Sequence, residues 1–585
     1  MAQGPDAEAV FKQHCAACHG AQAVEGVPNR EALRQLAPEA ILNSMVNGKM
    51  QAQATPLTQV ERVAVAEHLA GRPLAAAPSA ATSNRCNQPR PMSNPSALPS
   101  WNGWGNGAAN ARFQAAGLTA ADLPKLKLKW AFGYANVSAA RAQPTLFGGR
   151  LFAASENGEL HALDPASGCS YWSYKAQAGS RTAPSVGAYK NATGTLGYAV
   201  YFGDSRANVY AVDAQTGQLI WTRKMDDHAA AAITGAPTAH DGRLYVPVQG
   251  LNEEIQGGGE AYPCCTFRGS VSALDASTGA VIWKTYTIPE APRPRAKNDK
   301  GVQMWGPSGV SVWSAPTADA KRRLVYFGTG NGYSDPIQPN SDAVMALDAA
   351  SGAVKWIRQL TPGGESWVFA CMNSKPGNPA CPKQMGPDFD FSASPILTSV
   401  QGRDLLVIPQ KSGMAYALDP DKQGAVVWQQ RFGQGSAMGG QWGGTVDGEH
   451  FYIGVADLLT STPGGMRALK LADGRLVWQV PPQPRLCGDA KNCLAGQGGA
   501  LTGIPGAVLN GALDGGLRAY STEDGTMLWQ FDTNRDFDTV NGVKAKGGGM
   551  DGPGPVVAGR MLFVNSGYGG VVGRPGNVLL AFGLD

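Results

Sequence analysis

The chain has 585 residues, more than one ordinary core accommodates, which predicts several domains or one large repetitive domain. Glycine (76 residues) and proline (40) are abundant, while charged residues make up 16% and hydrophobic residues 43%, a balance that favours many turns between short strands over disorder. The net charge of +4 comes without a dense run of Lys and Arg or an apolar run of about 18 residues, so neither a nucleic-acid partner nor a membrane span is expected.

The amino terminus shows no export signal. Met1-Ala2-Gln3-Gly4 lacks a basic start followed by an apolar run, so we expect a secretory signal to be absent or to have been removed. The cellular compartment is predicted from the ten cysteines instead. Eight of them lie outside the motif described next, and eight free thiols would be unusual in a cytosolic enzyme. We therefore predict a periplasmic or secreted protein.

Residues 15–19 form Cys-x-x-Cys-His, the attachment signature of a c-type haem. Cys15 and Cys18 would form the two thioether bonds, and His19 would supply one axial ligand to the iron. A redox or zinc site is the competing interpretation, but no second cysteine pair lies nearby to complete a zinc site. The motif therefore predicts a covalently attached haem.

Helices are expected over residues 7–14 and 58–70, on either side of the haem motif. Two methionines between them could supply the sixth iron ligand. Met50 follows a glycine turn and precedes the second helix, whereas Met45 lies in an apolar helical stretch and is predicted to pack. We predict Met50 as the ligand and residues 1–72 as a small all-α cytochrome c domain.

A change of composition separates this domain from the rest of the chain. Residues 73–100 are rich in Ala, Pro, Ser and Asn without periodicity, which predicts a linker. In residues 101–585 one unit recurs: a strand ending in Ala-x-Asp, a turn, and a strand ending in tryptophan. Seven copies end in Trp172, Trp221, Trp283, Trp356, Trp428, Trp478 and Trp529.

An eighth copy begins at Ala581, and the sequence ends before its tryptophan. Trp130, far earlier in the chain, lies in a strand that would complete this last sheet and close a ring without open edges. Repeats of this spacing are typical of propeller blades. We predict an all-β eight-bladed propeller preceded by a small all-α cytochrome c domain.

Six of the remaining eight cysteines fall into pairs that are close in sequence, although eight cysteines permit 105 pairings. Adjacent cysteines bond only in a strained ring, so their occurrence is an unlikely accident. The predicted pairs are Cys264 with Cys265, Cys371 with Cys381, Cys487 with Cys493 and, by elimination, Cys86 with Cys169.

The repeat Ala-x-Asp-x-x-Thr-Gly-x-x-x-Trp resembles that of the pyrroloquinoline-quinone-dependent alcohol dehydrogenases, and the resemblance covers about residues 100–585. A cytochrome placed before the propeller resembles the polyvinyl alcohol dehydrogenase branch of this family. The resemblance implies pyrroloquinoline quinone, calcium and haem c as cofactors. The tryptophan repeat also occurs in non-catalytic propellers, so a scaffold fused to a cytochrome is an alternative from a different class.

Each blade is expected to begin with an inner strand beside the central channel, and several of these strands follow a proline. Cations, hydroxyls and one aromatic stand three residues before that proline. Such a polar funnel with one flat wall suits an anionic quinone and a metal, and a water-filled channel is the competing interpretation. The residues at these positions are Arg141, Arg181, Thr234, Trp313 and Ser392.

Gly328-Thr329-Gly330-Asn331 resembles the family segment whose asparagine binds calcium. Trp313, eighteen residues before Asn331, matches the tryptophan on which the quinone stacks. Calcium prefers several oxygen ligands, and the loop Asn252-Glu253-Glu254 offers the remaining carboxylate. Glu254 is preferred over Glu253.

The resemblance assigns further residues to the quinone. Lys411 matches the cation that hydrogen-bonds the reactive quinone oxygens, and Arg181 and Thr234 would hold carboxylate groups of the cofactor. Cys264 and Cys265 resemble the adjacent-cysteine disulfide that covers one face of the quinone. Their place in the chain differs from that of better-known members, which leaves contact with the quinone open.

The catalytic base is expected in Gly386-Pro387-Asp388-Phe389-Asp390-Phe391. Asp390 is preferred because the family base is an aspartate that follows an aromatic residue, while Asp388 is the alternative base, a second calcium ligand or a turn residue. The implied reaction is oxidation of secondary alcohols, including polymeric ones such as polyvinyl alcohol. Electrons would pass to the haem and then to an external acceptor such as a cytochrome c. A sugar or primary-alcohol dehydrogenase of the same mechanism is the alternative.

Overall fold

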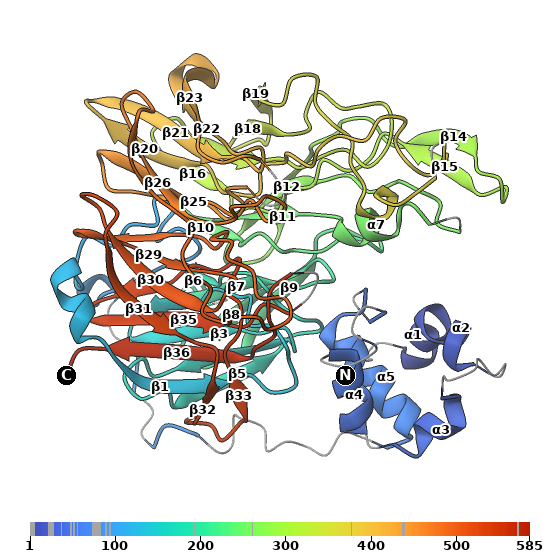
Figure 1. Ribbon diagram of the computed structural model, residues 1–585, viewed down its shortest axis with the longest axis horizontal. Helices are drawn as coiled ribbons and strands as arrows, with labels where there is room; N and C mark the ends of the chain where they lie inside the picture. The colour runs from blue at the N-terminus through green and yellow to red at the C-terminus, as the bar shows by residue number, and fades with distance from the viewer. Residues whose placement is uncertain are drawn as a thin grey trace.

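The computed structural model describes residues 6–585, with the exception of 21–27, 37, 47–49, 51–52, 55, 73–83, 88–89, 93–94, 192, 260, 376, 436–438 and 570–571. Figure 1 shows a small helical part beside a larger part made of strands. The predicted fold class is confirmed. The expectation about Met1–Gly4 lies outside the described residues.

The helical part contains the two helices expected from the sequence. At the start of helix α5 (Gln59–Ala70), Thr58 and Glu61 form a reciprocal cap, in which the Thr58 hydroxyl accepts from the Glu61 N–H and the Glu61 carboxylate accepts from the Thr58 N–H. Phe11 and Val65 pack in the small apolar core between the helices. The helices are α1 (Ala7–His14), α2 (Ala16–His19), α3 (Arg30–Arg34), α4 (Pro38–Val46) and α5 (Gln59–Ala70).

Eight four-stranded antiparallel sheets form the larger part of the described chain. In ring order, the first four blades are β2 (Thr145–Phe147), β3 (Arg150–Ala154), β4 (Glu159–Leu163) and β5 (Ser170–Lys175); β6 (Ser185–Lys190), β7 (Leu196–Gly203), β8 (Asn208–Asp213) and β9 (Leu219–Lys224); β10 (Thr238–His240), β11 (Arg243–Val248), β12 (Ser270–Asp275) and β13 (Val281–Tyr286); β16 (Thr317–Asp319), β17 (Leu324–Gly328), β18 (Ala343–Asp348) and β19 (Val354–Gln359).

The last four blades are β20 (Ile396–Val400), β21 (Arg403–Pro409), β22 (Met414–Asp419) and β23 (Ala425–Arg431); β24 (Thr445–Val446), β25 (His450–Gly454), β26 (Met466–Lys470) and β27 (Leu476–Val480); β28 (Thr502–Ile504), β29 (Ala507–Gly511), β30 (Gly516–Ser521) and β31 (Met527–Asp532); β34 (Val556–Ala558), β35 (Met561–Ser566), β36 (Val578–Gly583) and β1 (Lys127–Gly133). Outside the blades lie the hairpins β14 (Arg293–Lys297) with β15 (Gln303–Gly306) and β32 (Asp536–Phe537) with β33 (Ala545–Lys546), helix α7 (Leu251–Gln256), and the short 3-10 helices η1 (Pro95–Ala97), η2 (Ala120–Lys125), η3 (Phe369–Cys371) and η4 (Pro420–Lys422).

The final blade combines both ends of the propeller. Strand β1 pairs with β36, and Trp130 lies opposite Ala581. The prediction that the strand containing Trp130 completes the last sheet is therefore confirmed, and β1 leaves β36 with neighbours on both sides.

The sequence repeat has a direct structural cause. The aspartate of Ala-x-Asp accepts hydrogen bonds from the following turn, as Asp164 does from the N–H groups of Ala166 and Ser167. The tryptophan of one blade packs on the turn glycine of the next. A Cβ atom at Gly217 would lie 2.7 Å from the Trp172 ring, and φ is +77° there, so both space and backbone require glycine.

All four predicted disulfide pairs are present. Cys86–Cys169 attaches part of the predicted linker to the first blade. Cys15 and Cys18, the two cysteines of the haem motif, are the free thiols. None of the helices in the described ranges is both long and apolar enough to cross a membrane.

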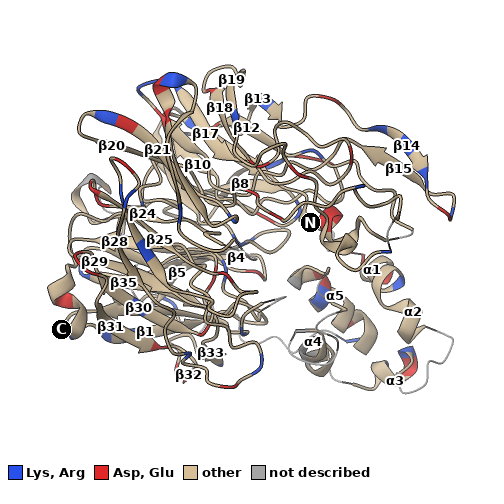
Figure 2. Ribbon diagram, turned by 45° about the horizontal axis from the view of Figure 1, so that its top comes forward, with Lys and Arg blue, Asp and Glu red and all other residues tan. Residues whose placement is uncertain are grey.

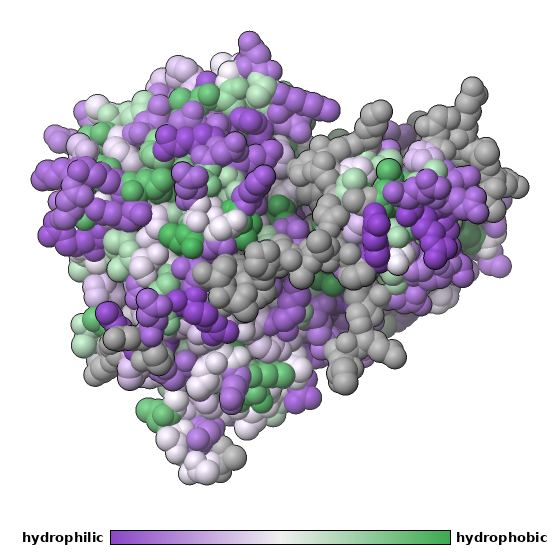
Figure 3. Space-filling view, turned by 90° about the horizontal axis from the view of Figure 1, so that it is seen from below, coloured by the Kyte–Doolittle hydropathy of each residue, from purple (hydrophilic) through white to green (hydrophobic). Residues whose placement is uncertain are grey.

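Charged residues of both signs are distributed over the blades and the helical part, as Figure 2 shows. The face in Figure 3 is largely hydrophilic with small separate hydrophobic areas. Lys and Arg residues are interspersed with Asp and Glu along the ribbon in Figure 2, in agreement with the modest net charge of the sequence.

Candidate active site

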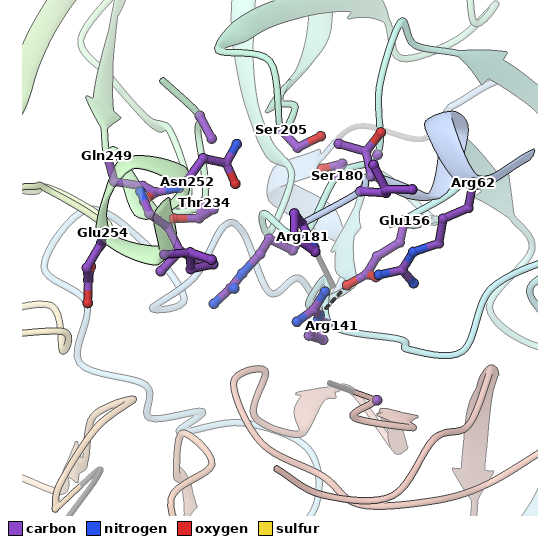
Figure 4. A pocket seen from close by; sticks show the side chains of 18 of the residues that line it. Arg62, Arg141, Glu156, Ser180, Arg181, Ser205, Thr234, Gln249, Asn252 and Glu254 are labelled. Carbon is purple, nitrogen blue, oxygen red and sulfur yellow. Dashed lines mark hydrogen bonds and ion pairs between the residues drawn. The ribbon is translucent and has the colours of Figure 1, made fainter. Parts of the chain in front are cut away.

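A cavity of about 310 Å³ lies where the helical part meets the mouth of the propeller channel (Figure 4). The helical part contributes Pro56, Leu57, Thr58 and Arg62 to its wall. Near this cavity, Arg206 Nη2 donates a hydrogen bond of 3.0 Å to Glu61 Oε1 of helix α5. From the propeller, the lining residues include Arg141, Glu156, Arg181, Thr234, Asn252 and Glu254.

Three of the predicted site residues form one cluster. The Trp313 indole Nε1 donates a 2.9 Å hydrogen bond to Asp390 Oδ2, and Lys411 Nζ lies 2.6 Å from Asp390 Oδ1. Lys411 Nζ also lies 5.2 Å from the centre of the Trp313 ring, within the range of a cation–π contact. Trp313 precedes β16, Asp390 precedes β20 and Lys411 follows β21, so neighbouring blades bring the three together.

Asp388 shares the same lysine. Lys411 Nζ donates to Asp388 Oδ1 at 2.9 Å. Burial raises the pKa of Asp388 to about 8, against the lowering effect of Lys411. Burial lowers the pKa of Lys411, but the two aspartates outweigh it and hold that pKa above its usual value. Lys411 is therefore a fixed cation between the two candidate bases.

Beside this cluster lies a second, narrow cavity with aromatic and cationic walls. Trp442 meets Trp313 edge to face with ring centres 5.3 Å apart, and the Arg181 guanidinium lies 5.1 Å from the Trp442 ring. Trp442 Nε1 donates 2.9 Å to Asp551 Oδ2. Thr234, Arg181 and Trp313 all line this narrow part of the channel. Arg181 and Thr234 also reach the upper cavity, so they connect the two spaces.

The predicted calcium residues differ in how their oxygens are used. Glu253 is fully buried, and its two oxygens accept 2.8 Å hydrogen bonds from the N–H groups of Thr266 and Phe267. Glu254 instead lines the cavity, and burial, together with the charge of Asp388, raises its pKa well above the usual value. The Glu253 carboxylate is thus used in hydrogen bonds to the backbone, whereas Glu254 faces the site.

Asn331 is buried, and both hydrogen bonds of its side chain use Nδ2, which donates 2.6 Å to the Trp367 carbonyl and 3.3 Å to the Gly332 carbonyl. This orientation leaves the side-chain oxygen as the remaining ligand atom. Among the described residues, no group of three His, Cys, Asp or Glu side chains forms a complete metal site. Asn331 and Glu254 would fit calcium only with additional oxygen ligands.

The Cys264–Cys265 disulfide is buried in an apolar cluster with Phe267. It packs beside Gly257, the residue that ends α7, where a Cβ atom would lie 2.9 Å from Cys264 Sγ. The cysteines are absent from the described lining of the cavity. The structure therefore places the pair behind α7 and does not bring it together with Trp313 and Lys411.

The residues predicted to bind haem lie together in the helical part. His19 is buried, and its Nδ1 lies 2.7 Å from the Pro28 carbonyl, which fixes the ring and leaves Nε2 for a metal. Met45 is buried in the core, while Met50 is half-buried at the edge of the same cluster. With two free thiols at Cys15 and Cys18, these side chains fit a covalently held haem.

Comparisons with known proteins agree with this arrangement. The family profile for the beta-propeller domain of glucose, ethanol and alcohol dehydrogenases matches residues 101–363, and that of cbb3-type cytochrome c oxidase subunit III matches residues 2–69. The chain is 41% identical to the polyvinylalcohol dehydrogenase of a Pseudomonas species, over 99% of this chain and 94% of the relative. This chain belongs to the polyvinyl alcohol dehydrogenase family of quinoprotein enzymes.

A second member of this family, from Sphingopyxis sp. strain 113P3, is 37% identical over 99% of this chain and 93% of its own length. Among solved structures, the quinohemoprotein alcohol dehydrogenase ADHIIG of Pseudomonas putida HK5 superposes with a TM-score of 0.60 at 18% identity, covering 83% of this chain and 80% of that chain. That structural likeness supports the propeller fold. A profile of the outer membrane assembly factor BamB also matches residues 411–577.

Trp442 and Asp551 were not predicted from the sequence as residues of the site. The comparison of blades relied on the proline before each inner strand, and Gly444 stands there before β24. Arg62 was missed for another reason, since no sequence pattern places the cytochrome over the channel.

Proposed function

We propose that this quinoprotein oxidises secondary alcohols, including the polymeric substrate polyvinyl alcohol, and passes the electrons through a haem to an external acceptor such as a cytochrome c. The observation that carries the proposal is the joining of Trp313, Asp390 and Lys411 at the channel. The names of the 41% and 37% identical relatives support the substrate class.

Pyrroloquinoline quinone, when bound, supplies the electrophilic carbon that accepts a hydride from the alcohol carbon. Trp313 offers the flat surface on which such a ring system stacks, and Lys411 offers a fixed N–H donor beside it. Arg181 and Thr234, which line the deeper channel, would bind carboxylate groups of the cofactor. The role of the Cys264–Cys265 pair in covering the ring stays a prediction, and the pair lies buried in an apolar cluster beside α7.

Calcium, when bound, acts as a Lewis acid at the quinone oxygens. Glu254 and the side-chain oxygen of Asn331 would be its protein ligands. Burial, followed by the charge of Asp388, raises the pKa of Glu254, and the nearby carboxylates of Asp388 and Asp390 are the feature of this chain that favours a divalent cation there.

Asp390 would accept the proton of the alcohol hydroxyl. Trp313 and Lys411 each hold one of its oxygens, which fixes the carboxylate at the place where a substrate would meet the cofactor. Asp388 is the alternative base, because it contacts the same lysine and burial raises its pKa to about 8.

A haem held by Cys15, Cys18, His19 and Met50 supplies one-electron transfer. The proximity of the helical part to the channel supports this role, since Pro56–Thr58 and Arg62 line the same cavity as Arg181. A periplasmic or secreted location is proposed on the four disulfides of the chain. The domain boundaries proposed are residues 1–72, a linker over 73–100, and 101–585.

Haem reduction in the full-length protein tests the function. The protein is loaded with pyrroloquinoline quinone and Ca²⁺, and visible absorbance is followed after addition of polyvinyl alcohol, pentane-2,4-diol, ethanol or glucose. Reduction by the polymer and the secondary diol, faster than by ethanol or glucose, is expected. Faster reduction by ethanol or glucose would support the alternative substrate classes, and no reduction by any of them would contradict the proposal.

A further inference from the structure

Two buried carboxyl groups lie behind the segment that carries both candidate bases. Asp342 directly precedes β18 and is 0% exposed, and Glu365 lies in the loop between β19 and η3 and is 2% exposed. The Glu365 backbone N–H donates 3.0 Å to the hydroxyl of Ser341, the neighbour of Asp342. The two acids therefore belong to one packed unit, and the proposed reaction uses neither.

The carboxylate of Glu365 holds the base segment by its backbone. Its Oε2 accepts a 3.0 Å hydrogen bond from the N–H of Asp388, and its Oε1 accepts from the N–H of Phe389. A Cβ atom at Gly386 would lie 2.2 Å from Glu365 Oε2, so the segment approaches this carboxylate too closely for any residue but glycine. Both oxygens of Glu365 are thus committed to the residues immediately before Asp390.

Asp342 lacks such partners. Within the described part of the chain, neither of its carboxyl oxygens accepts from a backbone or side-chain donor that carries a fixed hydrogen. Its hydrogen-bonding neighbour is the carboxyl group of Glu365. Two carboxyl groups can hydrogen-bond each other only when one of them carries a proton.

The surrounding charges favour the proton on Asp342. Burial, followed by the charges of Glu365, Asp390 and Asp388, raises the pKa of Asp342 well above its usual value. The cation of this region, Lys411, contacts Asp388 and Asp390. Glu365, in contrast, gains from being ionised because two N–H groups point at its oxygens.

We propose that Asp342 is a protonated donor to Glu365, and that the Glu365 carboxylate, so fixed, clamps the Asp388 and Phe389 N–H groups and thereby sets the position of Asp390 against Trp313 and Lys411. Asp342 and Glu365 are positioning residues in this arrangement. The inference rests on the proposed alcohol oxidation with Asp390 as base. It adds a device that sets the geometry of that base.

Substitution of the clamp tests the positioning role. Glu365→Gln keeps one acceptor oxygen and turns an amide N–H₂ toward the other backbone N–H, so the segment should shift. We expect kcat for the secondary diol to fall about tenfold or more, because sub-ångström to ångström misplacement of a reacting group has effects of this order. KM for the diol and the affinity for quinone should remain unchanged. The kinetic isotope effect with substrate deuterated at the alcohol carbon should increase, since the chemical step becomes slower.

Two substitutions at Asp342 test whether its side chain acts as a hydrogen-bond donor or only fills space. Asp342→Ala removes the donor and should lower kcat as Glu365→Gln does. Asp342→Asn should rescue kcat, because its amide donates to Glu365 and asparagine tolerates the φ of +50° at this position. The control is Asp319→Asn, a buried acid of the same blade that contacts Arg322 and Tyr326 and should keep wild-type kcat.

An infrared measurement tests the proton without reference to activity. Glu254, Asp388 and Asp551 also have raised pKa values, so the test is the difference spectrum between the wild-type protein and Asp342→Asn at pH 7, which should contain the C=O band of one additional protonated carboxylic acid in the wild-type protein. Loss of kcat in Asp342→Asn equal to that in Asp342→Ala, or a difference spectrum without the C=O band, would overturn the proposal. A wild-type protein that oxidises no alcohol but still shows the band would contradict the proposed function and leave the carboxyl pair intact.

Discussion

The indole Nε1 of Trp313 donates a 2.9 Å hydrogen bond to Oδ2 of Asp390, so the proposed platform of the quinone and the proposed base move as one unit. Lys411 completes the unit from the neighbouring blade. A change to any of the three side chains should therefore affect both the binding of the quinone and the oxidation of the alcohol, in proportions that differ between substitutions.

Trp313→Ala and Trp313→Phe should separate stacking from hydrogen bonding. Alanine removes a large flat contact, and quinone affinity should fall by about a hundredfold, corresponding to roughly 3 kcal/mol. Phenylalanine keeps a ring but loses the donor to Asp390, so affinity should change less while kcat falls by about tenfold. Titration of the apo-protein with quinone and steady-state rates measure the two effects. Equal quinone affinity in all three proteins would remove Trp313 from the site.

Asp390→Asn and Asp388→Asn should distinguish the candidate bases. Asparagine keeps the shape of Asp390 but cannot accept the proton, so turnover should fall by about a hundredfold or more with quinone and haem still bound. Asp388→Asn should retain more activity. The reverse pattern in steady-state rates would transfer the role to Asp388, and normal rates in both variants would exclude this segment as the source of the base.

The two methionines of the helical part should respond differently to alanine. Met50→Ala should remove the absorbance signature of methionine-ligated, low-spin haem. Met45→Ala should keep that signature but lower the free energy of unfolding by about 2–5 kcal/mol, because Met45 is buried in the apolar core. Visible spectra and thermal unfolding measure the outcomes. Covalent haem that persists in Cys15→Ala/Cys18→Ala after acid-acetone extraction would refute the attachment site.

Asp551 should make the quinone-free protein less stable as the pH rises. Burial raises the pKa of Asp551 from 3.8 to about 7. Between these values the folded protein keeps a proton that the unfolded chain has lost, so the stability from this group is complete below pH 4 and decreases up to about pH 7. The loss is at most about 4 kcal/mol at 1.36 kcal/mol per pKa unit. Asp551→Asn should flatten this part of the curve in urea unfolding, and an unchanged slope would contradict the raised pKa.

The contact between Arg206 and Glu61 should influence electron transfer between the two parts. Glu61→Gln should slow haem reduction by the substrate-reduced enzyme by about twofold to fivefold, because partly exposed ion pairs contribute little individually. Turnover with a small artificial acceptor should stay the same. Arg485→Gln, which alters an exposed pair with Asp489, is the control for charge. An equal effect of both substitutions on haem reduction in stopped-flow absorbance would remove the contact from this role.

The repeating units could be predicted from sequence because every blade has the same turn and the same packing of its tryptophan. Aspartate at a turn, glycine under a ring and tryptophan opposite alanine recur for physical reasons, and Trp130 could be assigned to the last blade by the same rule. Three of the disulfides followed from proximity in the sequence, and Cys86–Cys169 followed by elimination.

The carboxyl pair of Asp342 and Glu365 could not be predicted. These residues lie in loops of different length from those of the other blades, and their contact depends on the course of those loops rather than on any periodic pattern. The position of Arg62 over the channel likewise follows from tertiary packing, since a linker without periodicity places no constraint on where the helical part comes to rest.

The pairing of β1 with β36 also makes the active site sensitive to the last residues of the chain. A protein that ends before Val578 would leave β1 and β35 without their shared partner, and the ring would open beside the channel. The loss would affect all cofactor-binding blades together, because each is held in place by its two neighbours. During synthesis the ring can therefore close, and form a complete binding site for quinone, only after β36 has been made.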